Sequence, residues 1–99
     1  MIIIALPYNN VKMNVPTQVQ RVLDMNRKIE TKVGNNIRRL REAKGMTQEM
    51  LATKLQLMGC DITRSAVAKI EVGQRHLYPD EIILIRKILD TTFDAMLTV

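Results

Sequence analysis

The spacing of apolar residues is the feature that most limits what this chain can fold into. From Thr17 onward, apolar side chains recur at steps of three and four residues, beginning with Val22, Met25, Ile29 and Val33. That spacing places them on one face of an α-helix. Polar or glycine-containing segments interrupt the pattern at short intervals, and the sequence has no internal repeat. The pattern therefore predicts an all-α domain of five or six helices with short connections.

Composition narrows the function classes. The chain has 99 residues, enough for one hydrophobic core, and only 3% of them are aromatic. A formal net charge of +5 favours an anionic partner, although charge also keeps a small basic protein in solution. Cys60 and His76 are the only cysteine and histidine, which excludes an internal disulfide and an ordinary zinc site. We expect no metal, no cofactor and no small-molecule ligand.

The first residues carry no pattern that indicates export or membrane insertion. The apolar run Ile2–Leu6 has no basic residue before it and ends at Pro7. A membrane-spanning helix needs about 20 apolar residues, far more than this run supplies. We therefore expect a protein of the reducing cytoplasm.

Glycines and short polar side chains mark the ends of the predicted helices. The helix expected to begin near Val33 ends at Gly45, a glycine that follows a cation and is typical of a helix C-terminus. Its inward-facing apolar residues are Val33, Ile37 and Leu40. Its arginines are expected largely outside: Arg38, Arg39 and Arg41. The N-caps predicted for the helices that follow are Thr47, Thr63, Asp80 and Thr92.

Two short helices, 47–58 and 64–72, are joined by a polar turn and suggest a helix-turn-helix. In such a unit the second helix enters the major groove of DNA, about 12 Å wide, so its outer side chains must be small or polar. On a helical wheel the outward side consists of Arg64, Ser65, Ala68, Lys69 and Val72. The first helix must leave its N-terminus free, because the N–H groups and the helix dipole there favour a phosphate.

Three segments carry a resemblance to a known family. Between Val33 and Leu97 the chain contains, in order, VGNNIRRLREAKGMTQEMLATKL, ITRSAVAKIEVGQR and PDEIILIRKILDTTFDAML. In order and spacing they resemble the Cro/C1-type (XRE-like) helix-turn-helix family of phage repressors and bacterial regulators. The resemblance implies a five-helix, phage-repressor-like DNA-binding domain at residues 33–99. Residues 1–32 would then be an additional N-terminal arm with an amphipathic helix.

The resemblance also assigns roles to single residues. Together with the wheel, it places at the DNA the residues Gln48, Thr63, Arg64, Ser65, Ala68, Lys69, Gln74 and Arg75. Gln48 matches a glutamine that contacts phosphate and braces a base-reading side chain. Arg64 is the candidate for bidentate recognition of guanine, whereas Lys69 fits a phosphate as well as a base edge. Glu71 matches a glutamate that pairs with an arginine of the first helix, here Arg41, and this pair is structural.

The turn between the two motif helices is longer than in the common form of the family. Eight residues separate Leu55 from Arg64. A variant of the family with a longer turn exists, and the segment is similar to it. The extra residues are expected to extend the first helix through Met58, to turn at 59–61 and to return Ile62 to the core. The tilt of the recognition helix stays open.

The predicted fourth helix carries more apolar residues than one core-facing stripe needs. The inward stripe is formed by Ile82, Ile85 and Leu89. The other apolar residues there and in the last turn are candidate homodimer contacts: Ile83, Leu84, Ile88, Phe93 and Leu97. The amphipathic helix before residue 33 has three possible roles: docking on the domain, docking on a second subunit, or contacting DNA.

These features predict a sequence-specific double-stranded DNA-binding transcriptional regulator, a repressor that acts as a dimer on a palindromic operator. One alternative is the antitoxin of a toxin–antitoxin pair, which adds a protein partner. Another is a helix-turn-helix used only as a protein-interaction module, which the spare apolar surface supports. An enzyme is not expected, because the sequence has no Ser/His/Asp set, no phosphate-binding glycine loop and no paired carboxylates in a credible site.

Overall fold

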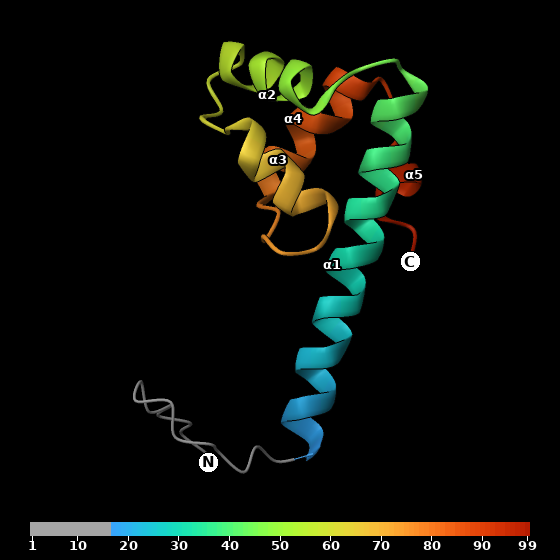
Figure 1. Cartoon of the computed structure of the whole chain (residues 1–99). Helices are drawn as coiled ribbons and strands as arrows, with labels where there is room; N and C mark the ends of the chain where they lie inside the picture. The colour runs from blue at the N-terminus through green and yellow to red at the C-terminus, as the bar shows by residue number, and fades with distance from the viewer. Residues whose placement is uncertain (1–16) are drawn as a thin grey trace.

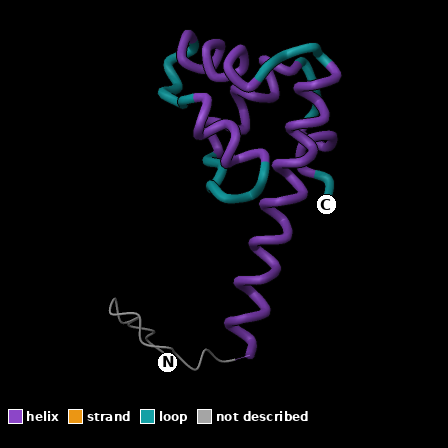
Figure 2. Tube along the Cα trace, in the orientation of Figure 1, coloured by secondary structure: helices purple, strands orange, loops and turns teal. Residues whose placement is uncertain are grey.

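The computed structural model describes residues 17–99, so the first part of the arm expected at residues 1–32, residues 1–16, lies outside the described residues. Within that range the chain forms five α-helices and no strand, which confirms the all-α prediction. The helices are α1 (Thr17–Ala43), α2 (Gln48–Leu57), α3 (Arg64–Glu71), α4 (Pro79–Leu89) and α5 (Phe93–Leu97). The other helices gather against the C-terminal half of α1, whose N-terminal half extends away from them (Figure 1). Short loops join the helices (Figure 2).

α1 is a single helix of 27 residues, so the separate helix expected to begin near Val33 is not observed. The sequence from Thr17 to Ala43 contains no proline, and its one glycine, Gly34, is helical. What changes along α1 is burial. Met25 in the N-terminal half is 57% exposed, whereas Ile37 in the C-terminal half is fully buried.

Gly34 permits a close contact between α1 and α3. A Cβ atom at this position would lie 2.2 Å from the carbonyl oxygen of Ile70 and 2.8 Å from that of Glu71. Both oxygens belong to the backbone of α3, which cannot yield as a flexible side chain would. The glycine is therefore required by helix packing and does not end a helix.

All five helices contribute to one hydrophobic core. Its fully buried members are Ile37, Leu51, Ala52, Leu55, Ile62, Val67, Ile70, Ile85, Leu89 and Met96. This set confirms the predicted return of Ile62 from the turn to the core. None of the helices in residues 17–99 is long and apolar enough to span a membrane.

Apart from the start near Val33, the predicted helix ends are correct at four places and wrong at one. The threonine N-caps are present at Thr47, Thr63 and Thr92. Gly45 ends α1 with a φ of 70°. Asp80 is not the N-cap of α4, which begins at Pro79 after Tyr78. Proline suits the first helical position, where no backbone N–H is needed.

The apolar side chains on the outer side of α4 are only partly exposed to solvent. Ile83 is 44% exposed, whereas Leu84 and Ile88 are half-buried against the core of their own chain. The guanidinium carbon of Arg86 lies 4.9 Å from the centroid of the Phe93 ring, within the range of a cation–π interaction. α4 and α5 are therefore linked at the surface that the sequence analysis proposes for a dimer.

Replacing Gly34 by Ala is expected to destabilise the fold by about 1–3 kcal/mol, the usual cost of forcing an extra carbon into a packed site. Urea unfolding followed by circular dichroism measures the change. The control is Asn35→Ala, because Asn35 is exposed on the same turn of α1 and should change stability by less than about 0.5 kcal/mol. Equal stability of the Gly34→Ala protein and the wild type would contradict the close contact between α1 and α3.

Candidate nucleic-acid interface

α3 has an inner side that packs and an outer side that is free. The inner side is almost fully buried and consists of Val67, Ile70 and Glu71. The outer side carries the exposed residues Arg64, Ser65 and Lys69, with Ala68 half-buried beside them. α2 packs against α3 at a steep angle (Figure 1). The outer side of α3 is therefore a narrow surface of small and basic side chains, held on a fixed support.

The N-termini of α2 and α3 are capped in the same way. The Thr47 hydroxyl accepts a hydrogen bond from the Met50 N–H group at 3.1 Å, and the Thr63 hydroxyl accepts one from Ala66 at 3.1 Å. Each cap satisfies one of the N–H groups that a helix leaves unpaired at its start, and the others can bind an anion.

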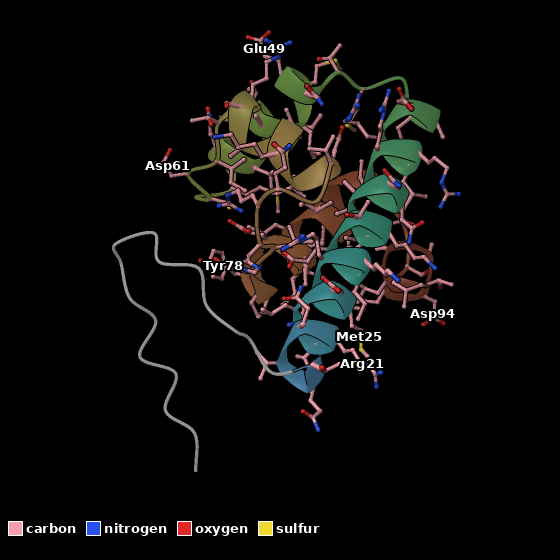
Figure 3. All side chains as sticks on the ribbon, turned by 60° about the horizontal axis from the view of Figure 1, so that its bottom comes forward. Arg21, Met25, Glu49, Asp61, Tyr78 and Asp94 are labelled. Atoms are coloured by element: carbon pink, nitrogen blue, oxygen red, sulfur yellow. The ribbon has the colours of Figure 1, made fainter. Side chains whose placement is uncertain are left out.

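Two acidic side chains limit where an anion can sit. Glu49 projects outward from the first turn of α2, and Asp61 from the connection to α3 (Figure 3). Both carboxylates are exposed and would repel a phosphate close to them. A DNA backbone at these helix ends must therefore lie away from both.

A buried polar cluster fixes α3 to α1 and α2. Arg41 Nε donates to Glu71 Oε2 at 2.6 Å, and Arg41 Nη2 donates to Glu71 Oε1 at 3.0 Å. Arg41 Nη1 also donates to the carbonyl oxygen of Met46 at 2.6 Å. From α2, Gln48 Nε2 donates to Glu71 Oε1 at 3.0 Å. The hydrogen bonds with Glu71, opposed by burial, raise the pKa of Arg41 above its ordinary value.

This cluster decides between two expectations for Arg41. Helical periodicity places Arg41 largely outside, whereas the family resemblance pairs it with Glu71. The structure contains the pair, with Arg41 7% exposed, so the expectation from periodicity is wrong. The same geometry turns the Gln48 amide toward Glu71, which makes it a brace for the recognition helix.

Gln74 and Arg75, the two predicted DNA contacts in the loop after α3, differ in whether other residues hold their side chains. Gln74 is exposed, but Arg75 is held by Glu81 through two hydrogen bonds of 2.9 Å each. The Arg75 guanidinium also lies 5.7 Å from the centre of the Tyr78 ring. Arg75 therefore ties the loop after α3 to the first turn of α4, and its pKa is raised by the hydrogen bond to Glu81.

Glu81 is a structural residue that the sequence analysis missed. It is 5% exposed and accepts a hydrogen bond from the Tyr78 N–H group at 3.0 Å, in addition to those from Arg75. Burial alone would raise its pKa, but the hydrogen bonds outweigh burial and lower the pKa below its ordinary value. A glutamate in the first turn of a helix is common, so nothing in the sequence singled it out as buried.

His76 lies at the surface and connects the loop after α3 to α1. Its Nδ1 is 2.8 Å from the Glu30 carboxylate, and its side chain is 77% exposed. An open crevice of about 560 Å³ runs between this loop and the N-terminal half of α1, with Asn26, Arg27 and Gln74 in its lining. Within residues 17–99, no three acidic, histidine or cysteine side chains gather where a metal ion could be held.

The comparison with protein families agrees with this geometry. A helix-turn-helix family model matches residues 37–96, which is more than half of the chain. The chain belongs to the Cro/C1-type helix-turn-helix family. Membership in this DNA-binding, non-enzymatic family implies DNA binding and a role in transcriptional regulation. The match begins inside α1, so the N-terminal half of that helix is outside it. No curated protein and no solved structure matches the chain.

Replacing Glu71 by Ala is expected to destabilise the protein by about 3–5 kcal/mol, because it leaves the buried Arg41 guanidinium without its partner. The double variant Arg41→Met/Glu71→Leu removes both charges and should recover most of the loss. Chemical unfolding of the wild type, Arg41→Met, Glu71→Leu and the double variant measures the coupling. Additive losses in the double variant would contradict a buried pair that acts as one unit.

Proposed function

We propose that this protein is a sequence-specific transcriptional regulator, a repressor that binds a palindromic operator in double-stranded DNA as a dimer. The observation that carries the proposal is the outer side of α3, where Arg64, Ser65 and Lys69 are exposed while Glu71 is locked below. A helix held in this way can enter the major groove without changing its orientation in the domain. The proposal places its action in the bacterial cytoplasm, on chromosomal or phage DNA.

Each exposed side chain suits a distinct contact. Arg64 at the start of α3 can donate two hydrogen bonds to guanine, a contact that contributes about 1–3 kcal/mol of discrimination. Ser65 and Ala68 are small enough for the helix to approach the base edges. Lys69 reaches a phosphate or a base edge, and Gln74 lies in position for a phosphate beyond the end of the helix.

The three remaining residues of the predicted DNA site act through the scaffold in this proposal. Thr63 contributes its capping hydroxyl to the start of α3. Gln48 braces Glu71, and the N-terminus of its helix is left for a phosphate. Arg75 holds the loop that carries Gln74, because its guanidinium is bound by Glu81.

The dimer surface that we propose includes α4 and α5. Ile83, Phe93 and Leu97 are 44%, 42% and 38% exposed, so each leaves apolar surface that a second subunit can cover. Leu84 and Ile88 would support them from below, since both are half-buried. A dimer with a twofold axis places two recognition helices in successive major grooves, about 34–36 Å apart. Such a complex would repress transcription by covering a promoter.

The double variant Arg64→Ala/Lys69→Ala is expected to remove sequence-specific binding and to remain folded, because both side chains are exposed. The probe is the duplex that the wild type selects from a random-sequence pool, measured by fluorescence anisotropy at several salt concentrations. Affinity should fall at least tenfold, and the salt dependence should become shallower as phosphate contacts are lost.

The charge-matched control is Lys32→Ala/Arg38→Ala, which removes two exposed cations from α1. It should keep most of the affinity for the selected duplex. An equal loss in both double variants would show that binding follows total charge, and this would contradict a recognition role for α3.

The dimer is tested by sedimentation velocity at micromolar concentration. The wild type should sediment as a dimer and Ile83→Asn as a monomer, because a polar side chain would be buried without a partner. Met50→Asn on α2 is the control, since Met50 is also 44% exposed but lies outside the proposed surface. A monomeric wild type would contradict the proposed dimer. It would not contradict DNA binding, which the anisotropy measurement tests.

A second candidate function rests on the N-terminal half of α1. Val22, Leu23 and Met25 are 54%, 47% and 57% exposed on a helix that extends away from the domain. An antitoxin or a protein-interaction module would use such a surface for a protein partner. For an interaction module, the Arg64→Ala/Lys69→Ala variant should keep its partner. A regulator should lose its operator.

A further inference from the structure

The connection between α2 and α3 is ordered by its own backbone. It consists of residues 58–63. The Gly59 N–H group donates to the Gln56 carbonyl at 3.0 Å, and the Cys60 N–H group donates to the Leu55 carbonyl at 2.9 Å. This pattern closes the end of α2 and requires a left-handed residue, which Gly59 supplies with a φ of 86°. The long connection therefore starts in a defined direction.

A side chain of α2 then holds the far end of the same connection. Gln56 Nε2 donates to the carbonyl oxygen of Ile62 at 2.7 Å. The side chain of Ile62 is 1% exposed, so the residue is anchored on both sides. Ile62 is followed directly by Thr63, whose hydroxyl caps α3 through the Ala66 N–H group. A short chain of contacts thus links the last turn of α2 to the first turn of α3.

We propose that Gln56 is a positioning residue for DNA recognition, which sets the direction in which α3 leaves the connection. This inference rests on the proposed DNA-binding function. Gln56 does not need to touch DNA. It determines the position of Arg64 and Ser65 relative to the N-terminus of α2. In the proposed complex, this N-terminus contacts the same DNA duplex.

The physical reason lies in the length of the connection. Six residues between two helices allow more than one path. Toward α3 the connection has one internal backbone bond, from the Ile62 N–H group to the Cys60 carbonyl at 2.9 Å, and the Gln56 side chain adds a direct bond from α2 to Ile62. When only a fraction of molecules holds the binding geometry, the apparent affinity falls by that fraction. Loss of one hydrogen bond typically changes such a population by about twofold to tenfold.

The test replaces Gln56 by Met, which has a similar length and no charge but cannot donate a hydrogen bond. Two duplexes of equal length serve as probes: the one selected by the wild type from a random pool, and a shuffled version of it. Gln56→Met should bind the selected duplex about twofold to tenfold more weakly and the shuffled duplex equally well. The variant should also select a broader set of sequences when the selection is repeated.

The control in the same helix is Thr53→Ala, because Thr53 is exposed and no side-chain hydrogen bond to it is seen in residues 17–99. It should keep the wild-type ratio of the two affinities. All proteins are compared at a temperature where unfolding measurements show them to be folded.

Three results would overturn the inference. An unchanged ratio of affinities in Gln56→Met would show that the hydrogen bond does not position α3. If Gln56→Met weakens binding to both duplexes equally, and by as much as the folded fraction falls, then Gln56 contributes to stability alone. If the wild type selects no preferred sequence, the proposed function itself fails, and the role of Gln56 fails with it.

Discussion

The buried ion pair between Arg41 and Glu71 is the interaction on which the recognition helix depends. Removing both charges from water is costly, and only complete hydrogen bonding offsets that cost. The bonding is supplied by three parts of the chain, because Arg41 lies on α1, Glu71 on α3 and the added donor Gln48 on α2. Small displacements would break these bonds. The pair therefore fixes the rotation of α3 about its own axis more strictly than apolar contacts alone would.

That rotation decides which side chains are available for DNA. α3 has eight residues, little more than two turns, so it has few positions with which to anchor itself and still present a surface. Val67 and Ile70 share the inner side with Glu71, which leaves the outer side to small and basic residues. The close approach at Gly34 brings the backbone of α1 against the same inner side. Anchoring and the recognition that we propose thus use separate residues of one short helix.

The sequence predicts features that depend on neighbouring residues. It does not predict the position of a side chain whose partner is distant in the chain. A threonine cap depends on neighbours within one turn of the helix, and the cap at Thr63 was predicted correctly for that reason. Arg41 and Arg75 could not be placed by periodicity, because their positions depend on carboxylates at residues 71 and 81. The helix expected to begin near Val33 is the continuation of α1, whose one glycine is helical and packs against α3. The family resemblance supplied the pair with Glu71, which periodicity alone would have missed.

A long connection and a precise recognition helix are compatible when the connection is tied at both ends. Lengthening a loop raises the entropy cost of closing it only slowly, so added residues lower the free energy of unfolding only a little. The added residues affect the direction of the following helix instead, because each one gives the chain more possible paths. Here Gly59 fixes the exit from α2, and the buried Ile62 fixes the entry to α3. With Gln56 joining the two ends, the connection behaves as part of the scaffold, and the direction of α3 is set by α2 as well as by the ion pair beneath it.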